Sequence, residues 1–405
     1  MTRGVRSRAD GDGEVVLHVV TAARRRGAET FAVDLAESLS ARGTPSEVVA
    51  LAPADAGDPL PVPVLGRRAL APATLRALRR RARRARAVVA HGSRTLPAAA
   101  LALAGLRTPA VYRSIGDPAA WAGTGRRRLQ TRLLLSRMDA VTVLWPAAAD
   151  EVHRLHGVPR SRLHVLPNAV PAHRCPVPGA ADRAAARQRF ALPTEAPVVA
   201  VVGALAPEKR VGDVIAAVAA LPDANLLVAG DGPERAALEE RAAAEAPGRV
   251  VFAGSLPGPA AALAAADVVA LPSRTEGMPG VLIEAGLSGL PAVATDVGGV
   301  DQVVVDGETG VLVPPGDVAA LTAGLRRALA ERDRLGAAAR RRCLDRFEIG
   351  PVADRWRDLL ATLTDPDPGP AGGARRRPPG RRRRHGRGRA PTLGRPADQG
   401  GGSTP

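Results

Sequence analysis

Two glutamates, Glu276 and Glu284, flank a glycine-containing loop and have seven residues between them. The pattern predicts a strand that ends near Leu271, a loop with two glycines, and a helix that begins near Gly280. A helix N-terminus after such a loop offers free backbone N–H groups and a partial positive charge, which suit a phosphate or pyrophosphate. The carboxylates beside it can accept hydrogen bonds from hydroxyl groups. Together they indicate a site for a nucleotide sugar.

Lys209 is the one lysine among 57 lysines and arginines. Lysine offers a compact point charge where arginine offers a planar fork, so something local favours an ammonium group at this position. The rest of the composition carries little information, since the bias towards Ala, Arg, Gly and Pro is typical of a genome rather than of a function.

Short apolar runs alternate with amphipathic helical stretches, an order that predicts parallel sheets covered on both faces. In the first half the expected strands are Val15–Val20, Val48–Leu51, Val62–Leu65, Ala87–Ala90, Ala110–Tyr112, Ala140–Leu144 and Leu163–Leu166. In the second half they are Val198–Val202, Leu226–Ala229, Val250–Phe252, Val268–Leu271, Ala292–Ala294 and Val311–Val313.

The alternation restarts after a proline-rich linker at 168–179, so we expect an α/β protein with two Rossmann-like, doubly wound domains that face each other across a cleft. Ligands of such sheets bind beyond the carboxyl ends of the strands. The expected organisation is a disordered N-terminus at 1–14, a first Rossmann-like domain at 15–172, a second at 173–346, a helix that packs back on the body at 347–364, and a disordered Arg/Pro/Gly-rich tail at 365–405.

The segment from Glu276 to Glu284 resembles the Glu-x7-Glu motif of retaining family 4 glycosyltransferases with the GT-B fold. Gly203-Ala-Leu-Ala-Pro-Glu-Lys209-Arg210, Ala229-Gly-Asp-Gly-Pro-Glu and Asp306-Gly-Glu-Thr-Gly-Val-Leu-Val-Pro follow the order of the family's other landmarks. The resemblance covers about 15–363. It implies transfer of a sugar from a UDP- or GDP-sugar to an unidentified acceptor, with retention of configuration and without a metal or other cofactor.

The resemblance also implies that the first domain binds the acceptor and the second domain binds the nucleotide-sugar donor, and it assigns roles to residues. Glu276 would hold hydroxyls of the donor sugar, Glu284 would hold the ribose, and Lys209 would bind the diphosphate. The other donor-site residues are Gly203, Arg210, Gly277, Met278, Pro279, Gly280 and Val281. In the first domain, Arg26 and Gly27 stand where the family's glycine loop meets the acceptor or a phosphate.

The chain departs from the family's pattern at two places. Ala204 replaces the usual arginine of the phosphate loop, for which Arg210 or Arg274 could compensate. No histidine stands at the usual first-domain position, where the sequence reads Tyr112-Arg-Ser-Ile-Gly-Asp117. We therefore expect His91, which ends the preceding strand and should project toward the cleft, to be the catalytic or acceptor-side candidate, with Asp117 as the next.

The net charge of +17 is unevenly distributed, with ten arginines against three aspartates after Leu363. A second cluster, between Arg76 and Arg86, indicates contact with anionic lipid or with a phosphorylated substrate, or simply a solvated helix face. Cys175 and Cys343 form no metal or disulfide pattern. We expect a cytoplasmic protein, with the inner face of the plasma membrane as a peripheral site, no metal, and no specific nucleic-acid partner.

Three alternatives stay open. Ala204 and the missing histidine are compatible with a catalytically degenerate partner protein that still binds a nucleotide sugar. The basic tail is compatible with a nucleic-acid-binding protein. A sugar-nucleotide epimerase shares the same architecture.

Overall fold

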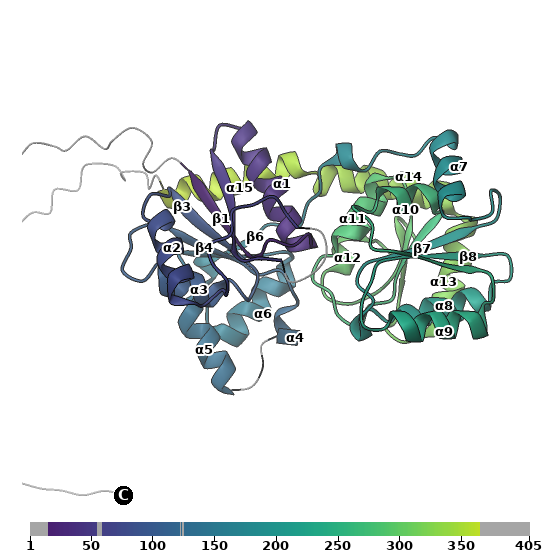
Figure 1. The fold of residues 1–405 in the computed structure, drawn as a ribbon, viewed down its shortest axis with the longest axis horizontal. Coiled ribbons are helices and arrows are strands. Elements are labelled where there is room, and N and C mark those ends of the chain that lie inside the picture. Colours follow the sequence, from purple (N-terminus) through teal and green to yellow (C-terminus); the bar gives the residue numbers. More distant parts are fainter. Residues whose placement is uncertain (1–14, 55–58, 122, 124, 365–405) are drawn as a thin grey trace, which may run out of the picture. The chain divides into compact units, whose positions relative to one another are not determined.

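The computed structural model describes residues 15–54, 59–121, 123 and 125–364 (Figure 1). The segments predicted to be disordered, 1–14 and 365–405, lie outside these residues.

The first sheet has six parallel strands in the order β2-β1-β3-β4-β5-β6. Its strands and the helices between them are β1 (Val16–Ala22), α1 (Gly27–Ala41), β2 (Ser46–Ala52), α2 (Pro72–Ala82), β3 (Ala87–His91), α3 (Leu96–Ala102), β4 (Ala110–Arg113), α4 (Pro118–Trp121), α5 (Gly125–Leu135), β5 (Ala140–Val143), α6 (Pro146–His156), the 3-10 turn η1 (Arg160–Arg162), β6 (Leu163–Val165) and the 3-10 turn η2 (Ala172–Arg174).

The second sheet also has six parallel strands, in the order β12-β11-β10-β7-β8-β9. Its elements are α7 (Ala180–Arg189), β7 (Val198–Val202), the 3-10 turn η3 (Pro207–Lys209), α8 (Val211–Ala219), β8 (Asn225–Ala229), α9 (Arg235–Glu245), β9 (Val250–Gly254), α10 (Ala260–Ala265), β10 (Val268–Leu271), α11 (Gly280–Leu287), β11 (Ala292–Thr295), α12 (Val300–Val303), β12 (Gly310–Val313), α13 (Val318–Ala330), α14 (Arg332–Arg346) and α15 (Ile349–Thr364).

The predicted fold class is confirmed, because each sheet is parallel and carries helices on both faces (Figure 1). Apolar strands such as β7, with the sequence Val-Val-Ala-Val-Val, are buried along almost their whole length because both faces are covered. We call the two sheets with their helices the first lobe and the second lobe.

The expected strand at Val62–Leu65 is wrong. Val64 forms only an isolated bridge to Ala50 of the edge strand β2. Pro61 and Pro63 have no backbone N–H to donate, so this segment cannot continue a regular ladder and runs beside the sheet edge instead.

Helix α15 follows the second lobe in sequence but packs on the first. Its Trp356 is fully buried and joins Leu359 in one apolar cluster with Phe31 and Leu35 of α1. Figure 1 shows α15 running alongside α1. The first lobe is therefore completed by a helix from the opposite end of the described chain.

Candidate active site

Lys209 and Glu276 meet beyond the carboxyl ends of two neighbouring strands. Lys209 ends the turn after β7, and Glu276 lies in the loop after β10, the strand beside β7. The Lys209 Nζ atom is 2.5 Å from Glu276 Oε1, and the Ser273 hydroxyl donates to the same oxygen at 2.6 Å. The lone lysine thus stands beside the first glutamate of the motif, where parallel sheets bind their ligands.

The loop that carries Glu276 is packed closely against other backbone. A Cβ atom added to Gly277 would lie 2.1 Å from the Ile115 carbonyl oxygen of the first lobe. One added to Gly298 would lie 2.0 Å from the Glu276 carbonyl oxygen, and the Gly299 N–H donates to the Gly277 carbonyl at 2.8 Å. Glycine is needed at these positions because backbone approaches backbone from two sides.

Substitution of Gly277 by alanine should displace this loop and weaken nucleotide-sugar binding by about tenfold or more, because the obstructing atom is a backbone oxygen that cannot turn aside. Titration calorimetry measures the effect. Gly258→Ala is the matched control, since a Cβ atom there meets nothing within 4 Å. Equal affinity in the two variants would contradict the assigned role of the loop.

Helix α11 begins at Gly280, as the sequence predicts, with Pro279 as its N-cap. The Met278 side chain is buried and its sulfur accepts a hydrogen bond from the Asn168 N–H at 3.3 Å. Val281 lies in the first turn, where backbone N–H groups have no partner within the helix. The first turn of α11 therefore follows the loop directly, and binding of an anion there stays a prediction.

Glu284 lies one turn into α11 within a cluster of charged groups. Arg174 of η2 forms an ion pair with Asp34 of α1, and the charges of both residues act on the pKa of Glu284. Burial raises the pKa of Glu284 to about 7, with Arg174 opposing the rise and Asp34 adding to it. Burial likewise raises the pKa of Asp34 to about 6, against the Arg174 charge. Glu284 is thus only partly ionised at neutral pH in the unliganded protein.

The loop after β7 rests on the Gly-Asp-Gly turn after β8. A Cβ atom on Gly230 would be 1.8 Å from the Gly203 carbonyl oxygen, and one on Gly232 would be 2.3 Å from that of Leu205. This Gly-x-Gly pattern therefore allows two loops to touch, and Gly203 lies exposed at the strand end.

Two arginines were expected to replace the one missing at Ala204. Arg210 adopts a left-handed conformation with φ of 51° and is paired with Asp213, Nε to Oδ2, at 2.7 Å. Arg274 is exposed, and its backbone N–H donates to the Glu208 carbonyl beside Lys209. Both lie close to η3 in sequence or in space, while Ala204 itself is exposed.

His91 ends β3 as expected but is buried, and its catalytic or acceptor-side role stays a prediction. Its ring is 2% exposed and its Nε2 lies 3.0 Å from Nδ1 of His18, which is fully buried. Burial lowers the pKa of His18 to about 3 and that of His91 well below its ordinary value. The cause is the helix-covered sheet, which encloses even the last residue of β3.

The remaining first-lobe candidates lie at helix starts. Asp117 accepts from the Ala119 N–H at 2.9 Å and so caps α4. Arg26 is the exposed N-cap of α1, and Gly27 is its exposed first residue.

Sequence reasoning passed over three contacts of the first half of the chain: His18 with His91, Arg113 with Asn168, and Asp34 with Arg174. The signal for His18 was a polar residue inside an otherwise apolar strand. Nothing in the sequence connects Asp34 with Arg174, because their ion pair joins positions 140 residues apart.

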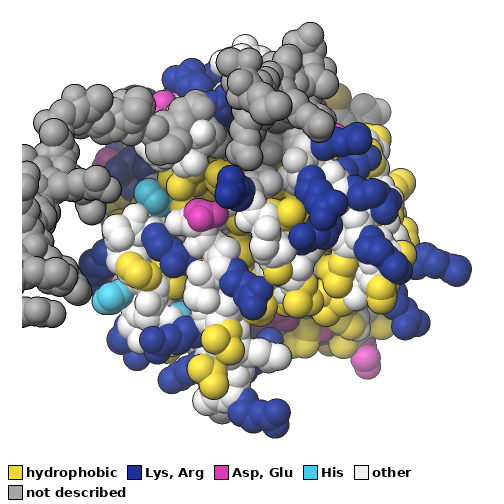
Figure 2. Space-filling model, turned by 90° about the vertical axis from the view of Figure 1, so that its left-hand side faces the viewer, with side chains coloured by type: hydrophobic (Ala, Val, Ile, Leu, Met, Phe, Trp, Pro, Cys, Tyr) yellow, Lys and Arg dark blue, Asp and Glu magenta, His cyan; other side chains and the backbone are white. Residues whose placement is uncertain are grey.

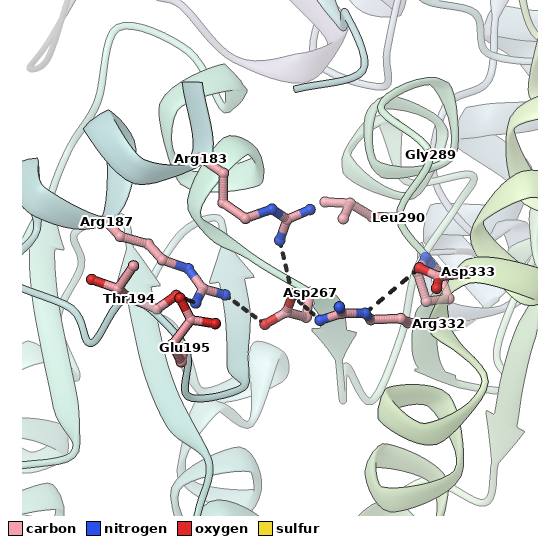
Figure 3. Close-up of a pocket in the computed structure, with 10 residues that line it drawn as sticks. Arg183, Arg187, Thr194, Glu195, Asp267, Gly289, Leu290, Arg332 and Asp333 are labelled. Carbon is pink, nitrogen blue, oxygen red and sulfur yellow. Dashed lines mark hydrogen bonds and ion pairs between the residues drawn. The ribbon is translucent and has the colours of Figure 1, made fainter. Parts of the chain in front are cut away.

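A pocket lies at the amino ends of the strands of the second sheet, opposite the ends that carry Lys209 and Glu276 (Figure 3). Asp267 precedes β10, is almost fully buried, and pairs with Arg183, Arg187 and Arg332 at 2.7 to 2.8 Å. Its carboxylate also accepts from the Val198 N–H. These contacts tie α7 and α14 to the sheet and account for the pocket structurally.

The exchange Asp267→Asn should lower the stability of the fold by about 3 to 5 kcal/mol, because it leaves the buried Arg187 guanidinium without its counter-charge. Thermal unfolding measures the loss. Nucleotide affinity should stay unchanged at a temperature where the variant is folded, since Asp267 lies at the amino ends of the strands and Lys209 beyond their carboxyl ends. A changed affinity would contradict this separation.

The arginine cluster of α2 is partly committed to the lobe itself. Arg79 donates to the carbonyls of Ala102 and Ala104, and Arg81 pairs with Glu47 at 3.0 Å. Figure 2 shows basic side chains spread over one face of the molecule, with hydrophobic ones between them. None of the described helices combines the length and apolar character that a membrane span requires.

Two Rossmann-like lobes, with charged residues such as Lys209 and Glu276 beyond the carboxyl ends of the strands, are typical of the GT-B class. The family model described as Glycosyl transferases group 1 matches residues 182–342, and the one described as Glycosyltransferase Family 4 matches residues 25–174. The chain belongs to this glycosyltransferase family.

Similar proteins include the 2-deoxystreptamine glucosyltransferase of Streptomyces kanamyceticus, 37% identical over 49% of this chain and 53% of that protein. A GDP-mannose-dependent phosphatidylinositol monomannoside mannosyltransferase of Mycolicibacterium smegmatis is 32% identical over 61% of this chain and 68% of its own. The chain spans about half the length of the first of these relatives.

Among solved structures, HepE of Anabaena in complex with UDP and glucose has the same fold. Its TM-score is 0.76 at 21% sequence identity, over 86% of this chain and 99% of that one. Sucrose-phosphate synthase of Thermosynechococcus elongatus gives a TM-score of 0.72 at 22% identity over the same shares.

Proposed function

We propose that this protein transfers a sugar from a nucleotide-diphosphate sugar to an acceptor with retention of the anomeric configuration. The observation that carries the proposal is the pairing of Lys209 with Glu276 beyond the carboxyl ends of β7 and β10, next to the start of α11. A cation, a carboxylate and free helix N–H groups are the three features that a sugar diphosphate requires.

In the proposed reaction the bond between the anomeric carbon and the diphosphate oxygen breaks, and its electron pair goes to the diphosphate. Lys209 and the N–H groups from Met278 to Val281 stabilise that charge. Glu276 holds sugar hydroxyls, and Glu284 holds the ribose. The acceptor oxygen then bonds to the anomeric carbon from the same face, and its proton passes to the departing diphosphate oxygen. Electrostatic support from these groups takes the place of a metal, and we assign no protein nucleophile.

The donor class rests on the relatives. HepE was solved with UDP and with UDP-glucose, and two of the mycobacterial relatives are described as GDP-mannose-dependent. UDP- and GDP-sugars are therefore the first donors to test. For the acceptor we propose only that it meets the first lobe, on the side of Arg26 and Gly27.

A cytoplasmic protein in peripheral contact with an anionic membrane remains our proposal for location. It rests on the basic side chains of the first lobe, such as those of α2 that the lobe does not engage.

Thermal stabilisation of the full chain by a panel of nucleoside diphosphates and their sugars tests the proposal, followed by assays of sugar release with candidate acceptors. We expect one nucleotide to raise the melting temperature and its sugar to be consumed. Stabilisation without consumption under any acceptor would favour the degenerate partner. Failure of every nucleotide to bind would overturn the proposal.

A further inference from the structure

A hydrogen-bonded relay runs from the first lobe to the loop that carries Glu276. The Arg113 guanidinium donates to the Asn168 Oδ1 at 3.1 Å, and the Asn168 Nδ2 donates to the Met278 carbonyl oxygen at 3.1 Å. Arg113 ends β4 and Asn168 follows β6, so the relay begins on the first sheet and ends in the loop between β10 and α11.

Arg113 is an unusual buried cation. It is 1% exposed, its guanidinium lies 3.7 Å from the centre of the Phe31 ring, and its Nε has no hydrogen-bond partner. None of the ion pairs described in the structure includes it. Because this buried charge has so few acceptors, its hydrogen bond to the Asn168 Oδ1 atom is strong. That bond holds the Asn168 side chain in place and polarises its Nδ2–H towards the Met278 carbonyl.

The same strand end touches the loop a second time. Ile115, two residues after Arg113, places its carbonyl oxygen where only a glycine at position 277 fits. The Asn168 N–H also donates to the Met278 sulfur. The loop is therefore fixed from the first lobe at two adjacent residues, Gly277 and Met278.

We propose that Arg113 and Asn168 are positioning residues that hold the Glu276–Gly280 loop in the conformation that receives the donor. The inference rests on the proposed function for the identity of the ligand, but the positioning itself concerns the unliganded protein. Arg113 acts through Asn168, and Asn168 acts on the backbone at Met278, so neither contacts the sugar.

The substitution Asn168→Asp separates positioning from structural support. An aspartate keeps the oxygen that Arg113 needs and gives that cation a counter-charge, but it replaces the N–H donor with an oxygen that repels the Met278 carbonyl. The fold should therefore keep its melting temperature while the loop loses its tether. Asn168→Ala removes both the tether and the acceptor of Arg113, and Arg113→Met removes the cation that holds Asn168. Both should lower the melting temperature as well.

Amide hydrogen exchange of the full chain, without ligand, reads the loop directly. Peptides covering 272–281 should exchange about tenfold faster in Asn168→Asp, while peptides from α15 exchange as in the wild type. The KM for the UDP- or GDP-sugar should rise by about tenfold with a smaller change in kcat. Arg187→Met is the matched control: it removes an equally buried arginine at the remote pocket, so it should lower the melting temperature and leave the exchange of 272–281 unchanged.

The inference would be overturned if residues 272–281 of Asn168→Asp exchanged as slowly as in the wild type. It would also be overturned if exchange there were accelerated to the same degree in Arg187→Met. Faster loop exchange in Asn168→Asp together with failure of the wild type to bind any nucleotide would support the positioning and overturn the proposed function instead.

Discussion

Replacement of Lys209 by alanine should lower kcat/KM for the nucleotide sugar by about 10- to 150-fold, the loss expected for one charge-assisted hydrogen bond worth about 1.5 to 3 kcal/mol. The ammonium group is 2.5 Å from Glu276 in the unliganded protein and must also meet the departing diphosphate. Steady-state kinetics with the donor that the thermal-stabilisation panel selects measure the loss. Glu208→Ala, in the same turn, removes an exposed charge and is the control.

Substitution of Glu276, which pairs with Lys209, should have the opposite effect on the binding of a nucleotide without its sugar. Glu276→Gln releases Lys209 from its counter-charge, so a nucleoside diphosphate without sugar should bind at least as tightly as to the wild type. Transfer should nevertheless fall, because the sugar hydroxyls lose a carboxylate. If Lys209→Ala left kcat/KM unchanged, the lone lysine would have no part in catalysis.

Glu284→Gln should make the protein more stable and less able to bind its donor. The pKa of Glu284 is raised from 4.5 to about 7 by burial, so this group contributes stability that is present at low pH and is lost as pH rises through about 7. Glutamine cannot ionise, and it should raise the melting temperature at alkaline pH by about 2 to 6 °C, from a shift worth roughly 1 to 3 kcal/mol.

Donor affinity should change with pH in the opposite sense. Ribose hydroxyls donate to a carboxylate more strongly than to a carboxylic acid, so the wild type should bind the nucleotide more tightly as pH rises through about 7. Glu284→Gln should bind weakly across this range and show less of the pH dependence. A variant that loses stability at alkaline pH, or that keeps wild-type affinity, would contradict the assignment.

The sequence was sufficient to predict the two parallel sheets, the start of α11 at Gly280, and the residues of the loop after β10. Apolar strands separated by helical stretches indicate by their composition that both faces of the sheet are buried. The two glutamates lie close together in the sequence, so their spacing can be recognised without the structure. The expected strand at Val62–Leu65 failed because apolar character was counted without the missing donors of Pro61 and Pro63.

The first-lobe part of the site was beyond such reasoning. His91 ends a strand, but whether a strand end is open or enclosed depends on helices that pack over it, and here the ring is buried against His18. The contacts of Asn168 with Met278 and of Arg174 with Asp34 join residues more than one hundred positions apart. The roles of these residues in donor binding stay predictions.

Calorimetric titration with UDP and GDP at alkaline pH, where Glu284 is ionised, tests the central claim most directly. The wild type should bind one nucleotide at a single site, Lys209→Ala and Glu284→Gln should each weaken that binding by tenfold or more, on the order of the loss of a charged hydrogen bond, and Arg187→Met should bind as the wild type does. Binding that survives both substitutions, or that Arg187→Met abolishes equally, would place the nucleotide elsewhere and contradict the account.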